Sequence, residues 1–123
     1  MIEAVPFRPV ALIVEDDQFQ RETLEILLSE NEIDVIQCES AEAAALVLEK
    51  YGGCLSILFT DINLAGRMDG IELAGLAKQR FPNLSVIVTS GAPPVRRLPD
   101  GATFWAKPWH PLDVVRAAQD ALH

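Results

Sequence analysis

Four short segments of this chain end in polar groups that could serve phosphoryl chemistry. The four are Glu15-Asp16-Asp17 after residues 10–14, Asp61 after 57–60, Thr89-Ser90 closing 86–90, and Lys107 after 103–106. Each preceding run is apolar enough to be a buried strand of a parallel sheet. In open α/β sheets, ligands bind at the carboxyl ends of the strands. We therefore expect these side chains to lie close together.

The carboxylates of this set suit a divalent cation and a covalent phosphoryl intermediate. Asp61 is ionised at neutral pH and can attack phosphorus to form an aspartyl phosphate. A phosphoryl group beside several carboxylates needs a cation to offset the negative charge. Magnesium prefers octahedral oxygen ligands, usually one or two carboxylates together with phosphate. The sequence predicts a Mg²⁺ (or Mn²⁺) site formed by Glu15, Asp16, Asp61 and the backbone carbonyl of Asn63.

The remaining polar groups suit contacts to the phosphoryl oxygens. Lys107 would place an ammonium group on a phosphoryl oxygen, or on Asp61 when no phosphoryl group is bound. Thr89 would donate a hydrogen bond to the phosphoryl group. Pro108 after the lysine suggests a cis peptide bond, a form found in about 5–6% of X–Pro bonds. Taken singly, a strand threonine or an acidic helix start has an ordinary structural explanation.

Length, charge and cysteine content restrict the class of protein. The chain has 123 residues, which fits one domain over residues 1–123, with residues 1–9 as an extended lead-in and no output domain. The net charge of −8 argues against direct nucleic-acid binding. No apolar run reaches the roughly 18 residues of a membrane helix, and the N-terminus does not resemble a signal peptide. Cys38 and Cys54 lack metal-site spacing, so we expect reduced thiols in a cytoplasmic protein.

Strand-like and helix-like patterns alternate along the chain, which predicts a doubly wound α/β fold. The predicted strands are 10–14, 33–37, 56–60, 85–88 and 103–105. The predicted helices are 17–30 with Asp17 as N-cap and Phe19, Thr23, Leu24, Leu27 and Leu28 facing inward, one after Ser40 ending at Gly52-Gly53, 69–80, and 112–122. Residues 91–100 contain three prolines. They leave room for one or two helical turns, so the fourth helix should be short or distorted.

Taken together in this order, the segments resemble the receiver domain of bacterial two-component response regulators (CheY-like) over essentially the whole chain. The matching segments are residues 12–17, Phe59-Thr60-Asp61-Ile62-Asn63-Leu64, Met68-Asp69-Gly70, residues 86–91 and Ala106-Lys107-Pro108. The resemblance implies a flavodoxin-like five-stranded parallel sheet of order 2-1-3-4-5.

The resemblance also assigns roles to individual residues. Asp61 would be the phosphoacceptor, and Glu15 and Asp16 the acidic pair that binds magnesium with Asp61 and the Asn63 carbonyl. The others are Lys107 as the phosphoryl-binding lysine, Thr89 as the switch hydroxyl, Phe104 as the aromatic switch residue and Pro108 as a cis proline. Trp105 is expected on the opposite side of its strand from Phe104.

Two departures from the family pattern bear on the output. The loop from Asp61 to Gly70 carries an extra residue within 65–67, and the segment from Thr89 to Phe104 is about one turn short. Since the family commonly signals through its fourth helix and fifth strand, these departures put the usual output and dimerisation surface in question.

The predicted function is that of a phosphoacceptor switch, with self-phosphorylation and autodephosphorylation as its only catalysis. Its partners would be a sensor histidine kinase or histidine phosphotransfer domain, contacting Gln18, Gln20 and Arg21, and an unknown downstream protein. We expect a monomer or weak dimer. The alternatives are an interaction module with a vestigial site and a receiver segment of a hybrid histidine kinase. A phosphohydrolase is disfavoured because Asn63 stands where its acid/base aspartate would be.

Overall fold

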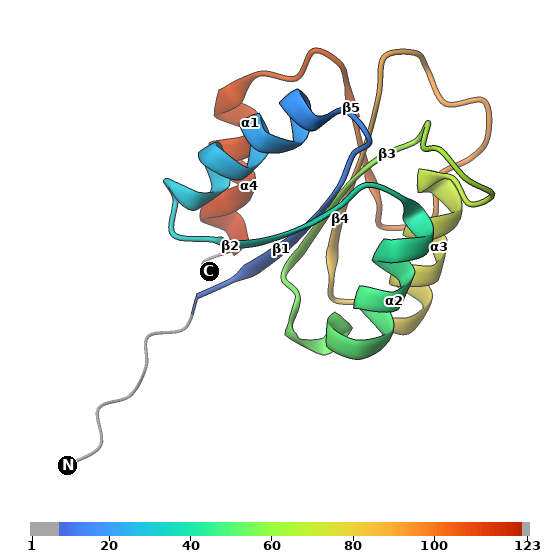
Figure 1. The fold of residues 1–123 in the computed structure, drawn as a ribbon, viewed down its shortest axis with the longest axis horizontal. Helices are drawn as coiled ribbons and strands as arrows, with labels where there is room; N and C mark the ends of the chain where they lie inside the picture. The colour runs from blue at the N-terminus through green and yellow to red at the C-terminus, as the bar shows by residue number, and fades with distance from the viewer. Residues whose placement is uncertain (1–7, 122–123) are drawn as a thin grey trace.

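The fold is a five-stranded parallel sheet with helices on both faces, in the order β2-β1-β3-β4-β5 (Figure 1). A computed structural model describes residues 8–121. The elements are β1 (Val10–Val14), α1 (Gln18–Ser29), β2 (Asp34–Cys38), α2 (Ala41–Tyr51), the 3₁₀ turn η1 (Gly52–Cys54), β3 (Ile57–Asp61), α3 (Gly70–Arg80), β4 (Ser85–Ser90), β5 (Thr103–Ala106) and α4 (Pro111–Ala121). The predicted fold class and strand order are confirmed. The predicted lead-in lies mostly outside the described residues.

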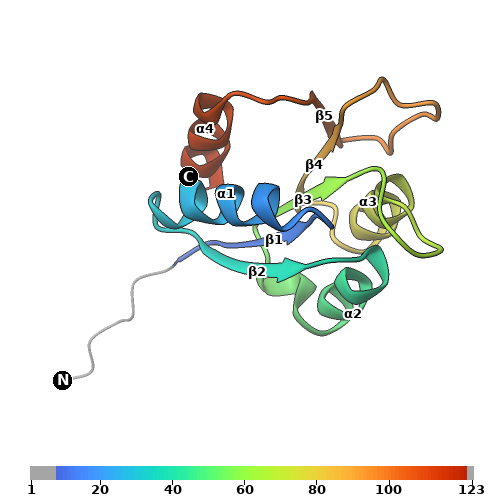
Figure 2. The same ribbon diagram turned by 45° about the horizontal axis from the view of Figure 1, so that its top comes forward.

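Two separate cores lie on the two faces of the sheet, and alternate residues of each strand contribute to them. Helices α2 and α3 cover one face, while α1 and α4 cover the other (Figures 1 and 2). Leu12, Leu58 and Val88 belong to the first core, and Ile13 and Phe59 belong to the second. The central strands β1, β3 and β4 are nearly continuous apolar runs because both of their faces are buried, whereas the edge strands β2 and β5 are partly exposed.

Side-chain caps fix where the helices begin, and this sets the loops that carry the site. The Asp17 carboxylate accepts a hydrogen bond from the Gln20 amide at 2.8 Å, and Ser40 caps α2 in the same way. Asp69 and Glu72 form a capping box at the start of α3. The predicted caps Asp17 and Ser40 are therefore both present.

Phe19 departs from the prediction that it faces the core. Its side chain is 78% exposed, whereas Leu24 and Leu28 are buried. Five residues along an α-helix correspond to about 500°, which turns Phe19 roughly 140° away from Leu24. The apolar pattern of α1 was therefore extended one turn too far toward its N-terminus.

The connection between β4 and β5, residues 91–102, contains no helical turn. Its backbone is held instead by local contacts. Arg96 pairs with Asp69 at 2.6 Å, and the Ala102 amide donates to the Pro99 carbonyl at 3.1 Å. The expected short or distorted helix is thus replaced by an irregular segment, because closely spaced prolines remove amide donors and disfavour helical geometry before them. The helix labelled α4 is the predicted last helix, whose residue Leu122 lies outside the described part.

Two further sequence-level expectations concern cysteines and membranes. Both cysteines carry free thiols, with Cys38 buried and Cys54 exposed. Within residues 8–121, no helix has both the length and the apolar character needed to cross a membrane.

Candidate functional site

The alternation of side chains along parallel strands directs four polar groups to one face. Asp61 lies in register with Thr89 on the neighbouring strand. Asp61 follows Phe59 by two residues, and Thr89 follows Ile87 by two, and both apolar residues belong to the core beneath α1 and α4. Glu15 and Lys107 stand in the same relation to Ile13 and Trp105. The period of two therefore brings these groups together at the carboxyl edge of the sheet.

Three carboxylates meet at this edge. One carboxylate oxygen from each of Glu15, Asp16 and Asp61 lies within 4.8 Å of the others. Glu15 and Asp61 are buried, at 7% and 8% exposure, while Asp16 is open to solvent. Asn63 lies exposed in the loop after Asp61. The cluster therefore combines two buried oxygen donors with one donor at the surface.

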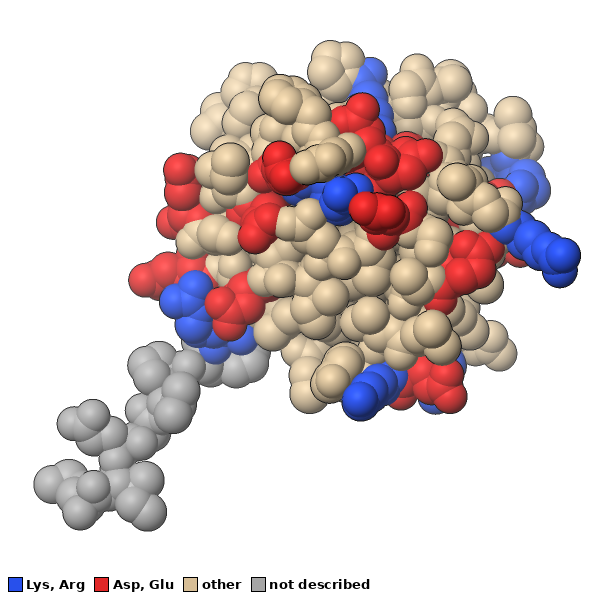
Figure 3. Space-filling model, in the orientation of Figure 1, with Lys and Arg blue, Asp and Glu red and all other residues tan. Residues whose placement is uncertain are grey.

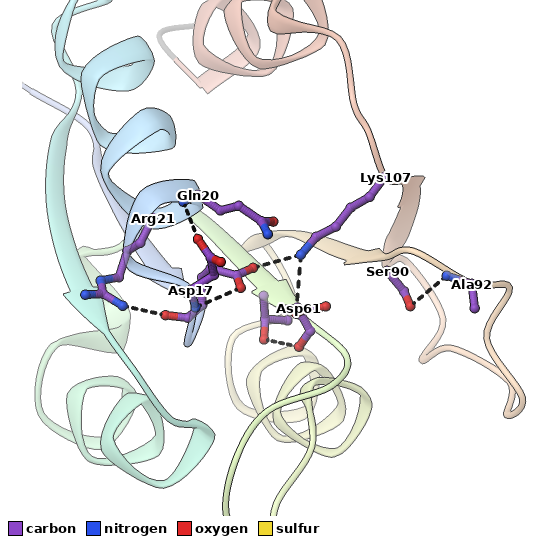
Figure 4. Close-up of polar contacts among 9 residues, drawn as sticks. Asp17, Gln20, Arg21, Asp61, Ser90, Ala92 and Lys107 are labelled. Atoms are coloured by element: carbon purple, nitrogen blue, oxygen red, sulfur yellow. Dashed lines mark hydrogen bonds and ion pairs between the residues drawn. The ribbon is translucent and has the colours of Figure 1, made fainter.

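Lys107 extends from the end of β5 to this cluster (Figure 4). Its Nζ lies 3.0 Å from Glu15 Oε2 and 3.3 Å from Asp61 Oδ2. Its backbone amide donates to the Ser90 carbonyl at 2.9 Å, and the peptide bond to Pro108 is cis. The ammonium group thus bridges the two buried carboxylates.

One ammonium group serves two buried carboxylates, and the pKa shifts reflect that imbalance. Burial raises the pKa of Glu15, and the hydrogen bond from Lys107 only partly offsets this effect. Burial alone would lower the pKa of Lys107, but the contacts with Glu15 and Asp61 outweigh it and raise that pKa. The cluster keeps an excess of negative charge, which a hard divalent cation with oxygen ligands would offset. The donor set therefore fits Mg²⁺.

The two aromatic residues of β5 lie on opposite faces of the sheet. Phe104 is in register with Val88 and is half-buried on the α2–α3 face. Trp105 is in register with Thr89 and packs edge-on against Phe59, with 5.5 Å between ring centroids. Trp105 therefore shares a face with Asp61 and Thr89, whereas Phe104 does not.

Two aromatic side chains, Phe19 and Trp109, lie next to the site, although the sequence did not predict them to be there. Trp109 borders the small cavity formed by Glu15, Asp61 and Thr89. It also lines an adjoining open hollow of about 380 Å³. The lining residues of that hollow are Phe19, Gln20, Thr23, Lys107, Pro108 and Trp109. Exposed Phe19 thus lines a hollow next to the site, together with Lys107. The sequence did carry one signal for Trp109, namely that an aromatic residue directly follows Lys107-Pro108.

Arg21 was predicted to contact the phosphohistidine partner together with Gln18 and Gln20, but its side chain does not lie on the exposed surface. Its side chain is only 9% exposed. It points to the side of residues 15–17, called the acidic loop from here on, that faces away from Lys107 (Figure 4). A lone arginine in an amphipathic helix gave no signal of this burial, because its partners come from distant segments.

The loop between β3 and α3 is held by a carboxylate from α2. Glu42 Oε1 accepts hydrogen bonds from the Arg67 and Met68 amides at 2.8 and 2.7 Å. The Met68 bond is the main reason that the pKa of Glu42 is lowered. Gly66 adopts a φ of 106°, which brings its backbone against this carboxylate. The part of the loop that carries the extra residue is therefore held against α2 by these contacts.

Acidic side chains predominate over basic ones on the face seen in Figure 3. This distribution agrees with the net charge of −8 over 123 residues. A cation is attracted to such a surface, whereas a polyanion is repelled.

Comparisons with known proteins agree on one family. The sequence profile of the response regulator receiver domain matches residues 11–111. Over 77 residues the chain is 39% identical to the response regulator protein FleR of Pseudomonas aeruginosa, a match that covers 63% of this chain and 16% of FleR. This chain therefore corresponds to a small part of that relative.

Solved structures share the fold at lower identity. A response regulator receiver protein from Sinorhizobium medicae superposes with a TM-score of 0.82 at 22% identity, covering 94% of both chains. The receiver domain of the hybrid histidine kinase CckA gives a TM-score of 0.79 at 24% identity, covering 93% of this chain and 99% of that one.

Proposed function

This chain belongs to the response regulator receiver domain family, and from that premise we propose that Asp61 accepts a phosphoryl group from a phosphohistidine donor. The observation that carries the proposal is the bridging of Asp61 and Glu15 by Lys107, with Asp16 beside them. Phosphorylation would then change which proteins the domain binds. Mg²⁺ (or Mn²⁺) would be held by Glu15, Asp16, Asp61 and the carbonyl of Asn63, and would supply positive charge next to the phosphoryl oxygens.

The transfer step uses the groups of this chain in simple roles. A carboxylate oxygen of Asp61 attacks phosphorus while the P–N bond to the donor imidazole breaks, and the imidazole nitrogen keeps the electron pair. Lys107 then contacts a phosphoryl oxygen in place of the Asp61 carboxylate, and the Thr89 hydroxyl donates a hydrogen bond to another. Water later attacks phosphorus and releases inorganic phosphate, which restores the carboxylate.

The switch is proposed to start at Thr89. Its contact with the phosphoryl group exists in one conformer only, so phosphorylation shifts the population toward that conformer. We propose that Phe104 moves next, as the aromatic residue of the switch. It lies on the α2–α3 face of the sheet, and the β4–β5 connection that precedes its strand has no helix.

A direct experiment is incubation with MgCl₂ and acetyl phosphate, followed by intact-mass measurement. Wild-type protein should gain one phosphoryl group, and Asp61→Asn should gain none. Asp17→Asn is a matched control, since asparagine caps a helix about as well as aspartate and Asp17 only caps α1. An unmodified wild-type protein at saturating MgCl₂ would contradict the proposal.

Donor docking is proposed at the hollow beside the site. Phe19 and Trp109 both line this hollow, and Phe19 is exposed while Trp109 is half-buried. Phe19→Ala should slow phosphotransfer from a phosphohistidine protein while leaving the reaction with acetyl phosphate unchanged. An equal effect on both donors would show that Phe19 supports the site and not the docking.

An interaction module with a vestigial site is the second candidate, because the β4–β5 connection lacks the helix through which the family commonly signals. In that case a binding partner should bind wild-type protein and Asp61→Asn equally, with or without acetyl phosphate. The partial match to FleR and the likeness to a hybrid-kinase receiver domain are compatible with a receiver that forms one part of a longer protein.

A further inference from the structure

Arg21 is a buried cation whose contacts lie on the far side of the acidic loop from Lys107 (Figure 4). With a side chain only 9% exposed, the guanidinium needs partners that replace its lost hydration. Its Nη1 donates to the Glu15 backbone carbonyl at 2.8 Å, and its Nε donates to Gln37 Oε1 at 2.9 Å. The nearest carboxylate, that of Glu39, lies 3.5 Å from Nη2 and is 80% exposed. The contact with the backbone carbonyl is therefore the shortest and most protected one.

That contact completes the polar contacts of Glu15. The Glu15 amide donates to the Cys38 carbonyl at 3.1 Å, and its Oε1 accepts from the Asp17 amide at 3.1 Å. Its Oε2 contacts Lys107, and its carbonyl accepts from Arg21. Every polar group of this residue is thus fixed, and the direction of the peptide plane between Glu15 and Asp16 is fixed with them.

Asp16 depends on that peptide plane for its position. Its side chain is exposed and has no hydrogen-bond partner among residues 8–121, yet its carboxylate lies within 4.8 Å of the other two. Its neighbours are anchored, with Glu15 held by Arg21 and Asp17 held as the cap of α1. The backbone orientation, and not a contact of its own, therefore aims the Asp16 carboxylate at the cluster.

We propose that Arg21 is a positioning residue for the divalent cation site, acting through the Glu15 carbonyl to hold Asp16 in place. This inference rests on the proposed function of the same site. Without the guanidinium, the peptide after Glu15 can rotate and the three carboxylates are no longer pre-arranged. Part of the cation's binding free energy then goes into ordering them, which lowers affinity.

The test is a titration with MgCl₂ alone, followed by the fluorescence of Trp105 and Trp109 and checked by Mn²⁺ electron paramagnetic resonance. Arg21→Met should raise the Mg²⁺ dissociation constant about tenfold, and Arg21→Lys, which can still donate to one carbonyl, should recover most of the affinity. In the acetyl phosphate reaction, Arg21→Met should need more MgCl₂ but reach the wild-type level of modification at saturation. Gln37→Leu is the matched control, since it removes another partner of Arg21 and should leave the Mg²⁺ affinity unchanged.

The outcomes separate this inference from the proposed function. A folded Arg21→Met protein that binds Mg²⁺ as tightly as wild type, or more tightly because a nearby cation is gone, overturns the positioning role. An equal loss in Gln37→Leu also overturns it, because the effect would then follow general disruption of α1 and β2. If Arg21→Met does not fold, Arg21→Gln takes its place, since its side chain is polar but too short to reach the carbonyl. Wild-type protein that binds no Mg²⁺ and forms no Asp61 adduct would instead refute the proposed function itself.

Discussion

Removal of the Lys107 ammonium should strengthen metal binding while it weakens the metal-free fold. Lys107 Nζ occupies the space between Glu15 and Asp61, at 3.0 and 3.3 Å from their oxygens. A divalent cation at the same carboxylates must compete with it. In Lys107→Met, a side chain of similar length without charge, that competition is absent.

The size of the effect follows from these distances. At an effective dielectric constant of about 20, a pair at this separation attracts by roughly 5 kcal/mol before desolvation is counted. Deletion of one partner of a buried pair costs about 3–5 kcal/mol. Lys107 is 18% exposed, so we expect a smaller loss of about 1–3 kcal/mol in unfolding free energy without metal. If the bound cation relieves about 1 kcal/mol of the repulsion between Glu15 and Asp61 that Lys107 no longer offsets, the Mg²⁺ dissociation constant falls about three- to tenfold.

The assay is urea unfolding in EDTA and in MgCl₂, with the Mg²⁺ affinity measured by tryptophan fluorescence. Lys107→Met should be less stable than wild type in EDTA, and MgCl₂ should recover more stability in the variant than in wild type. Lys50→Met serves as the control, because Lys50 lies exposed on α2. Weaker Mg²⁺ binding by Lys107→Met would refute the reasoning, since the lysine would then assist the cation site instead of competing with it.

Three further outcomes follow from single contacts. Gly70→Ala should lower the unfolding free energy by about 2 kcal/mol or more, because its Cβ would lie 1.9 Å from the Asp61 carbonyl oxygen; in the Gly75→Ala control, whose Cβ would have 3.7 Å of room, a loss of similar size would count against this explanation. Glu42 has a lowered pKa, so its contribution to stability is complete above the usual glutamate pKa and is lost as the pH falls through the lowered value. Glu42→Gln should therefore remove that part of the acid dependence of unfolding and speed hydrogen exchange at the amides that Glu42 binds, and an unchanged pH profile would refute its role. Arg96→Ala should increase hydrogen exchange and proteolysis in residues 91–102 with little change in the urea midpoint, since the pair with Asp69 is partly exposed to solvent; unchanged exchange there would mean that this pair does not hold the connection.

The sequence predicted the strands and the positions of the polar residues at their ends because both follow from short-range patterns. Continuous apolar runs are typical of doubly covered strands, and Asp61 and Lys107 each follow such a run directly. Since parallel strands end at the same edge, the proximity of Glu15, Asp61 and Lys107 could be inferred without any measured contact. The Asp17 and Ser40 caps were predictable for the same reason, since a cap and its helix are adjacent in sequence.

The features that escaped prediction depend on partners far away along the chain. The burial of Arg21 follows from Gln37 and from the direction of the Glu15 carbonyl, neither of which has a pattern in the sequence. Glu42 holds a loop that begins some twenty residues later, although a glutamate in the first turn of a helix is ordinary. The loss of the helix between β4 and β5 was only partly predicted, since prolines limit a helix without specifying what replaces it.

What replaces that helix determines how a signal could leave the site. The connection begins directly after Thr89 and Ser90, and Arg96 ties it to Asp69, the N-cap of α3. The next residue, Gly70, packs against the Asp61 carbonyl closely enough that no side chain fits. The backbone of the proposed phosphoacceptor, the start of α3 and the β4–β5 connection are therefore in direct mechanical contact. We therefore expect a displacement of Thr89 toward a phosphoryl group to move α3 and residues 91–102 first, because no helix lies between β4 and β5 within the described residues.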